Sequence, residues 1–190
     1  MKNNATRKLV ESAILVAIAY ILSYMKVDLM PNGGSVTLLS MLPLLLIGIR
    51  NGPYWGVGAG VVYGALQLLQ GIYPPPVANF GSFAAMILLD YIVAWGVIGL
   101  AGLAVFRGNK WGLAIAAPIC LALRYASHVL SGVIVWGSYD LEIWGHNINE
   151  GGTLAFSLLY NGTYMIPEII STTIVAVILV KAAPKLLEKN

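Results

Sequence analysis

The sequence WGLAIAAPICLALRYASHVLSGVIVW, residues 111–136, is long and apolar enough to cross a lipid bilayer, yet it contains Arg124 and His128. About 20 helical residues at roughly 1.5 Å each span the ~30 Å of bilayer hydrocarbon. An ionisable side chain at that depth costs on the order of 2.5–3.5 kcal/mol, so such residues usually face a polar cavity and serve a function. The segment therefore predicts a membrane protein with a polar site among its helices.

The composition of the whole chain agrees with a lipid environment. Of its 190 residues, 58% are hydrophobic and 10% are charged, with a mean hydropathy of +0.80, whereas soluble domains carry roughly 25% charge. The single cysteine, Cys120, lies within an apolar run and excludes a disulfide framework within one chain. We interpret Cys120 as a small core residue.

Six apolar segments predict six transmembrane helices. They are residues 9–25, 36–49, 54–69, 80–106, 111–136 and 153–180. The first and the last three are long enough to span readily, whereas the second and third are short. Glycine, proline and asparagine gather between several of the segments, as is typical of turns. The expected fold is an all-α integral membrane protein in which residues 1–190 form one six-helix transmembrane substrate-binding domain.

Basic residues gather on one side of this predicted topology. Nine of the eleven fall there: Lys2, Arg7, Lys8, Arg50, Arg107, Lys110, Lys181, Lys185 and Lys189. The positive-inside rule makes that side cytoplasmic, so we expect both termini in the cytoplasm. The net charge of +3 is then a topology signal, and a nucleic-acid partner has almost no support.

Three of the predicted helices bring polar residues to a similar depth. Asp90 lies about 15 Å below the outer surface on the fourth helix, and His128 lies about 25 Å along the fifth from its inner end. Asn161 and Tyr164 lie about 12–16 Å deep on the sixth helix. Arg124 lies one turn deeper than His128 on the fifth helix. These positions predict a small cavity that faces outward.

The side chains expected around this cavity suit a flat cation. Four candidates recur at every fourth residue of the fifth helix: Arg124, His128, Gly132 and Trp136. Gly132 leaves room for a flat group to approach the backbone. Tyr91 follows Asp90, and Phe156 and Tyr160 precede Asn161. One carboxylate, one amide and several aromatic faces favour a cationic or electron-poor aromatic ring.

Other interpretations of these residues stay open. Asp90 and Arg124 could form a structural ion pair between helices. An intramembrane enzyme could use Asp90 and His128 as acid and base, although no obvious nucleophile or metal set accompanies them. No catalytic residue and no metal site is therefore expected. A channel would need polar residues repeated along the bundle, whereas here they gather at one depth.

Five motifs, in order along the chain, carry a resemblance to a known family. They are GGSVTLLSMLPLLLIGIRNG at residues 33–52, LLDYIVAW at 88–95, LRYASHVLSG at 123–132, FSLLYNGTYMIP at 156–167 and APKLL at 183–187. Together they resemble the thiamine-specific substrate-binding membrane subunits, or S-components, of energy-coupling factor (ECF) transporters. The resemblance implies a non-enzymatic, high-affinity thiamine-binding subunit of an ABC-type importer, located in the bacterial cell membrane. A subunit for a thiamine precursor, a thiamine analogue or another vitamin is the nearest alternative.

The resemblance also implies roles for individual residues. Asp90, with Tyr91 after it, looks like the partner of the charged thiazolium ring, and Asn161 looks like the amide that binds the aminopyrimidine. His128 and Trp136 match ring-contacting positions. Further pocket residues are Gly132, Phe156 and Tyr164, with Arg124 as a support at the pocket floor.

Some positions depart from the family pattern. Family members often have Glu at the position of Asp90 and Tyr at the position of Phe156. In the loop after the first helix, Gly34 and Leu38 stand where some members have Trp and Glu. Residues 31–34 are expected to form a flexible lid at the outer mouth.

Partner proteins are implied as well. The chain has no GxxxxGK[ST] phosphate loop, so no cofactor is expected and ATP is used only by partner subunits. Ala13 and Ala17, one turn apart on the first helix, permit close packing against another membrane helix. In the resembling family, the equivalent pair contacts a transmembrane coupling subunit that two ATPases drive. The implied mechanism is capture of thiamine outside, followed by reorientation of the subunit in the membrane.

Overall fold

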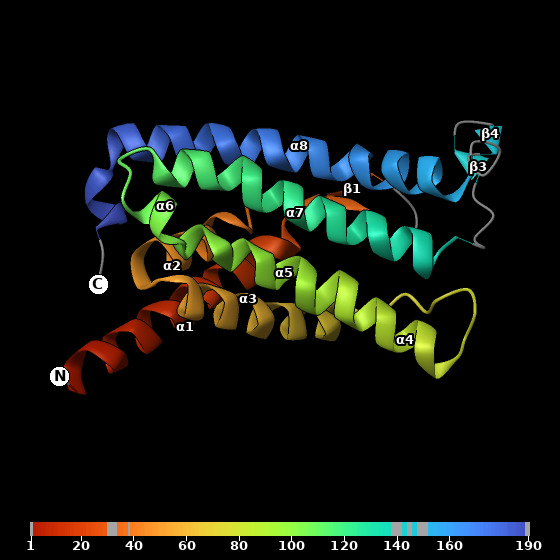
Figure 1. Cartoon of the computed structure of the whole chain (residues 1–190), viewed down its shortest axis with the longest axis horizontal. Coiled ribbons are helices and arrows are strands. Elements are labelled where there is room, and N and C mark those ends of the chain that lie inside the picture. Colours follow the sequence, from red (N-terminus) through yellow and green to blue (C-terminus); the bar gives the residue numbers. More distant parts are fainter. Residues whose placement is uncertain are drawn as a thin grey trace.

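The computed structural model describes residues 2–29, 34–37, 39–137, 142–143, 146–147 and 152–188, and it is mostly helical (Figure 1). The α-helices are α1 (Lys2–Tyr24), α2 (Leu42–Asn51), α3 (Pro53–Gln67), α4 (Phe80–Met86), α5 (Ala94–Gly96), α6 (Ala104–Arg107), α7 (Gly112–Ile134) and α8 (Thr153–Ala182). Other helical turns are η2 (Leu68–Gln70), η3 (Ile87–Val93), η4 (Val97–Gly102) and η6 (Pro184–Leu187). Strand β1 (Lys26–Asp28) pairs antiparallel with β2 (Ser35–Thr37), and β3 (Glu142–Ile143) pairs with β4 (His146–Asn147). The predicted helical class is confirmed.

Within the described part of the chain, three helical segments are long and apolar enough to cross a membrane. They are Phe80–Gly102, Gly112–Ile134 and Thr153–Ala182, which correspond to the last three predicted helices. Helix α1 has 23 residues, but it is not among them. Its first half carries Arg7, Lys8 and Glu11, which lower its suitability for the hydrocarbon region.

The second predicted helix begins later than expected. The prediction started it at Val36, which instead lies in strand β2. The chain then turns at Leu39, which adopts a left-handed backbone conformation with φ of 57°, and α2 begins at Leu42 with Pro43 in its first turn. Proline suits the first turn of a helix because its fixed φ is helical and no N–H is needed there.

The fourth predicted helix, residues 80–106, is broken rather than continuous. It passes from α4 through the π-helix η3 and α5 to the 3₁₀-helix η4. Leu103 is extended (φ −61°, ψ 148°), which separates η4 from the short α6. The change of helix type places Asp90 within η3, and single π-helical turns occur frequently at functional sites.

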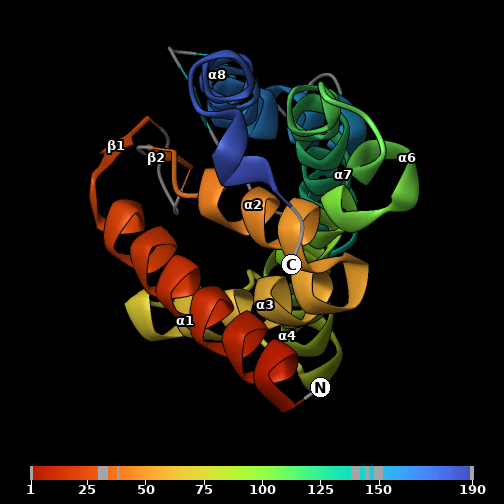
Figure 2. The same cartoon turned by 90° about the vertical axis from the view of Figure 1, so that its left-hand side faces the viewer.

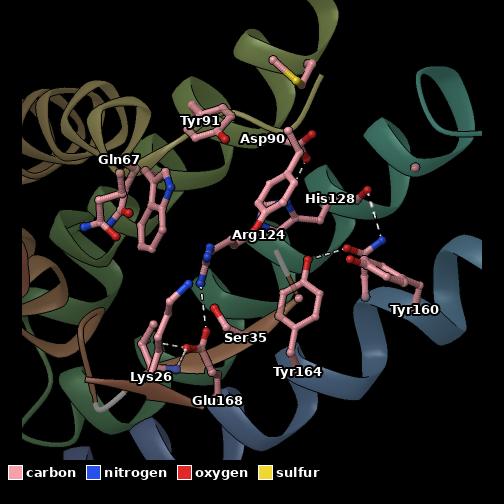
Figure 3. A pocket seen from close by; sticks show the side chains of 18 of the residues that line it. Lys26, Ser35, Gln67, Asp90, Tyr91, Arg124, His128, Tyr160, Tyr164 and Glu168 are labelled. Atoms are coloured by element: carbon pink, nitrogen blue, oxygen red, sulfur yellow. Dashed lines mark hydrogen bonds and ion pairs between the residues drawn. The ribbon is translucent and has the colours of Figure 1, made fainter. Parts of the chain in front are cut away.

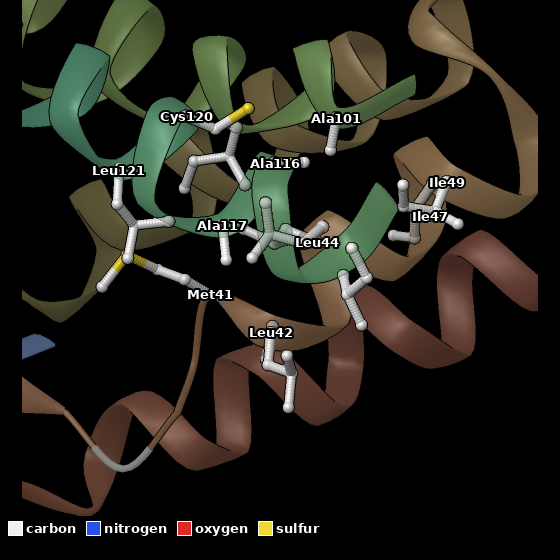
Figure 4. Packing of buried hydrophobic residues seen from close by; sticks show 14 of the residues in the cluster. Met41, Leu42, Leu44, Ile47, Ile49, Ala101, Ala116, Ala117, Cys120 and Leu121 are labelled. Atoms are coloured by element: carbon white, nitrogen blue, oxygen red, sulfur yellow. The ribbon is translucent and has the colours of Figure 1, made fainter. Parts of the chain in front are cut away.

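The helices pack in layers around an apolar core. Figure 2 shows α7 and α8 at the top, α2 in the middle, and α1 with α3 below. The buried core contains Leu44, Ile47, Cys120 and Leu121 (Figure 4), all fully buried. Cys120 is thus a core residue, as predicted.

The start of α1 and the end of η6 lie at the same end of the molecule (Figure 1). Two arginines join the elements there. Arg107 donates from Nε and Nη2 to the carbonyls of Ile49 and Arg50, each at 2.9 Å, and so satisfies the C-terminal end of α2. Arg50 in turn pairs with Glu11 of α1 and donates to the carbonyl of Leu186 at 2.6 Å. These bonds hold α1, α2, α6 and η6 together.

Candidate functional site

A cavity of about 240 Å³ lies among the β1–β2 hairpin, η2, η3, α7 and α8. All nine residues proposed from the sequence as substrate-binding line it: Asp90, Tyr91, Arg124, His128, Gly132, Trp136, Phe156, Asn161 and Tyr164. Figure 3 shows side chains from several of these elements pointing toward one another. The residues expected at a similar depth thus surround one cavity, and their roles in binding stay predictions.

Asp90 and His128 form the polar centre of this cavity. His128 Nδ1 lies 2.9 Å from Asp90 Oδ1, and Ser131 Oγ donates to Asp90 Oδ2 at 2.6 Å. Both carboxylate oxygens are thus held in place by α7. Within the described part of the chain, the buried His128 Nε2 has no hydrogen-bond partner. An unsatisfied buried nitrogen is unusual, since buried polar atoms normally have a partner.

Arg124 is held by a different carboxylate. Its Nη1 donates to Glu168 Oε2 at 3.0 Å and contacts Met41 Sδ at 2.8 Å, and its guanidinium lies 3.8 Å above the ring of Trp95. The alternative of an Asp90–Arg124 ion pair is therefore wrong, because Asp90 pairs with His128. Both charges of the Arg124–Glu168 pair are almost fully buried, which requires such pairing.

Glu168 was missed in the sequence. Glu168 is an acidic residue inside the apolar segment 153–180, and like Asp90 it is an ionisable group at membrane depth, where such groups usually serve a function. Further lining residues were also not predicted. They include Ser23, Lys26, Thr37, Gln67, Gln70, Tyr73 and Trp95. They come from α1, the β1–β2 hairpin, α3, η2 and other segments, and none of them is a charged residue inside an apolar segment.

Asn161 is engaged by the protein itself. Tyr164 Oη donates to its Oδ1, and its Nδ2 donates to the Ser157 carbonyl at 2.9 Å. Both the acceptor and the donor of this amide are thus already engaged by protein groups, so its expected hydrogen bonds to a ligand stay a prediction. The interactions do fix the amide at the cavity wall.

Aromatic rings of α8 form one wall. Phe156 and Tyr160 stack with centroids 5.9 Å apart and planes 28° apart, and Tyr164 lies edge-on to Tyr160 at 6.2 Å. The ring centroids of His128 on α7 and Tyr164 on α8 lie 6.1 Å apart. Such faces can stack on a flat heteroaromatic ring and attract a cation.

Gly132 has a packing role that the sequence did not reveal. A Cβ atom at this position would lie 2.0 Å from Ser157 Oγ. The glycine therefore allows α8 to approach α7 closely, in addition to lining the cavity.

The loop after α1 contributes its described part to the cavity. Gly34 lines it, whereas Leu38 and most of the proposed lid at residues 31–34 lie outside the described residues. Ala13 and Ala17 are exposed on α1 and take no part in the cavity lining.

Within the described residues, no group of three or more His, Cys, Asp or Glu side chains is arranged to hold a metal ion.

Comparison with known proteins gives a family. A family model described as thiamine transporter protein (Thia_YuaJ) matches residues 9–188, nearly the whole chain. The chain belongs to this thiamine transporter family. The resemblance drawn from the five sequence motifs is thereby confirmed, and membership of a transporter family disfavours the intramembrane enzyme.

Individual relatives of the thiamine transporter family match over almost their full length. Thiamine transporter ThiT of Bacillus subtilis is 36% identical, with 96% of this chain and 95% of the relative covered. Thiamine transporter ThiT of Lacticaseibacillus paracasei is 28% identical, with 94% and 89% covered. A solved structure of ThiT from Listeria monocytogenes matches with a TM-score of 0.74 at 26% identity, covering 97% of this chain and 98% of that chain. The family fold therefore extends over the chain.

Proposed function

We propose that this member of the thiamine transporter family is the thiamine-binding subunit, or S-component, of an ECF-type importer. The observation that carries the proposal is the cavity itself, where a histidine-bound carboxylate faces an aromatic wall. The subunit captures thiamine from outside in this cavity. It then releases the vitamin inside by reorienting in the membrane, together with an energy-coupling module.

The chemistry of the cavity suits the two rings of thiamine. The Asp90 carboxylate offers negative charge to the thiazolium, and the faces of Phe156, Tyr160 and Tyr164 offer stacking and cation–π energy of roughly 0.5–2 kcal/mol each. His128 Nε2 is buried without a hydrogen-bond partner, and a shift of the ring on ligand binding would let it accept from the amine of the aminopyrimidine. Arg124 supports the floor through Glu168 and Trp95. A cavity of about 240 Å³ limits the ligand to a small molecule.

The proposed topology has six spans in a single domain, with both termini in the cytoplasm. Two observations support it. The start of α1 and the end of η6 lie at one end of the molecule, as an even number of crossings requires. Arg50 and Arg107 lie at that same end, and the positive-inside rule favours the cytoplasm for it. The location is then the bacterial cell membrane.

A thiamine precursor, analogue or phosphorylated form is the competing ligand class. The deciding experiment is mass spectrometry of the small molecule that co-purifies with the detergent-solubilised protein, followed by titration of the emptied protein. We expect thiamine to be released and to rebind tightly. Recovery of a different heteroaromatic that outcompetes thiamine would replace the proposed substrate.

Binding should be visible through Trp136. Trp136 and Trp95 both line the cavity, but the Arg124 guanidinium covers one face of the Trp95 ring. We expect thiamine to quench tryptophan fluorescence, and Trp136→Phe to remove more than half of the quenching because a stacked electron-poor ring acts at short range. Trp111→Phe is the matched control, since Trp111 packs near Lys181 away from the cavity. Equal losses of signal in both variants would contradict the assignment of Trp136.

The coupling subunit and two ATPases are proposed partners, with α1 as the contact. Ala13 and Ala17 are exposed on this helix, where small side chains allow close helix packing. We expect Ala17→Trp to leave thiamine affinity unchanged but to abolish co-purification with the coupling subunit and thiamine uptake. Ala126→Trp is the control, because Ala126 is also exposed, but on α7. An Ala17→Trp variant that still transports would refute this interface.

A further inference from the structure

The β1–β2 hairpin forms part of the cavity wall, although it lies far in sequence from α7 and α8. Lys26, Gly34, Ser35 and Thr37 all line the cavity. Lys26 pairs with Thr37 in the antiparallel register, and Leu29 N donates to the Gly34 carbonyl at 3.0 Å. The two strands are therefore hydrogen-bonded to each other, so an interaction that fixes Thr37 also fixes this part of the wall.

Thr37 is held by Glu168. The backbone N–H of Thr37 donates to Glu168 Oε1 at 2.7 Å, and Thr37 Oγ1 donates to the same oxygen at 2.6 Å. Ser40 Oγ lies 2.7 Å from Thr37 Oγ1, so its hydroxyl can donate to Thr37 while Thr37 donates onward. Hydrogen bonds to an ionised carboxylate are stronger than hydrogen bonds between two neutral groups.

The other oxygen of Glu168 faces the cavity floor. Glu168 Oε2 accepts from Arg124 Nη1 at 3.0 Å, and Figure 3 shows this bond beside Ser35. Arg124 is itself packed on Trp95. Glu168 is buried, with 2% of its surface exposed, so water competes little for these bonds. One side chain thus joins the hairpin to the buried guanidinium of Arg124.

We propose that Glu168 is a positioning residue that holds the β1–β2 hairpin against the ligand cavity through Thr37, and thereby sets how long a bound ligand stays. The proposal rests on the proposed function in taking thiamine as that ligand. Glu168 acts through Thr37 and Arg124 and need not touch thiamine. Loss of the Thr37 side-chain bond should loosen the hairpin while the Asp90–His128 centre stays in place.

The test compares Thr37→Val with Thr37→Ser. Valine keeps the shape and removes the hydroxyl, whereas serine restores the hydroxyl. In chase experiments with labelled thiamine, we expect Thr37→Val to dissociate roughly tenfold faster than the wild type, as loss of one hydrogen bond to a charged group implies. Thr37→Ser should dissociate at nearly the wild-type rate. In a Glu168→Gln background, Thr37→Val should increase the dissociation rate of thiamine much less.

A second measurement does not depend on thiamine. Hydrogen–deuterium exchange of the hairpin, measured without ligand, should accelerate in Thr37→Val and return toward wild type in Thr37→Ser. Unchanged exchange and unchanged dissociation in Thr37→Val would overturn the proposal, as would equal effects of valine and serine. If the wild-type protein binds no thiamine, the proposed function fails, while the exchange data still decide whether Glu168 holds the hairpin.

Discussion

Asp90→Asn is expected to weaken thiamine binding at least about 100-fold while the protein stays folded. The substitution preserves the shape of the side chain and removes its charge, so the thiazolium loses its counter-ion in a water-poor cavity. Loss of one partner of a buried charge pair costs roughly 2–5 kcal/mol, and each 1.4 kcal/mol is about tenfold in affinity. Titration of the purified variant by tryptophan fluorescence measures the change directly.

A matched control separates charge at this site from charge in general. Asp28→Asn makes the same chemical change on the β1 strand, where Asp28 pairs with Lys26 at 3.1 Å and is largely exposed. Exposed ion pairs contribute little, so the affinity of this variant should stay within about twofold of wild type. An Asp90→Asn variant that folds and binds thiamine within threefold of wild type would remove Asp90 from the proposed role.

The depth of single polar residues was the most informative part of the sequence. Asp90, His128 and Asn161 lie on three separate apolar segments, and the helical rise alone placed them near one level. The structure brings them to one cavity. The prediction was possible because a charged group within the hydrocarbon region must face a polar cavity or a partner, so its position along the helix constrains the fold.

Pairing within the cavity could not be inferred in the same way. The four-residue repeat on α7 places Arg124 and His128 on one face, but rotation of the neighbouring helices decides which carboxylate each meets. In the structure, Asp90 on the π-helix η3 pairs with His128, and Glu168 on α8 pairs with Arg124. Local sequence carries no clear signal for such a change of helix type.

The β1–β2 hairpin is a second feature that the sequence does not predict. Ser35, Val36 and Thr37 form a three-residue strand, too short for alternation to be recognised, and the apolar run beyond it favours a helix. Pairing with β1 and the tertiary bonds from Thr37 to Glu168, 131 positions apart in sequence, place this segment on the cavity wall. Contacts of that separation are invisible to any local pattern.

Gly99→Ala is expected to lower the thermal unfolding temperature of the detergent-solubilised protein by on the order of 5–10 °C. A Cβ at Gly99 would lie 2.0 Å from the Val57 backbone nitrogen and 2.1 Å from the Gly56 carbonyl carbon. Neither contact is with a flexible side chain, so α3 and η4 must move apart. Overpacking of this kind costs typically 1–3 kcal/mol.

The same displacement should reach the ligand cavity. On the adjoining turns of α3, a Cβ at Gly60 would meet the Trp95 carbonyl oxygen at 2.3 Å, and one at Gly64 would meet that of Tyr91 at 2.1 Å. Helix α3 therefore supports the segment that carries Asp90 and Tyr91, and Gly99→Ala should also weaken thiamine binding several-fold.

Gly58→Ala is the control for the contact between α3 and η4. Gly58 lies on α3 two residues from Gly56, but no atom lies within 4 Å of its added Cβ. Alanine is the better helix former by about 1 kcal/mol, so this variant should unfold at the wild-type temperature or slightly above it. If Gly99→Ala and Gly58→Ala unfold at the same temperature, the close backbone contact between α3 and η4 is not what stabilises this part of the fold.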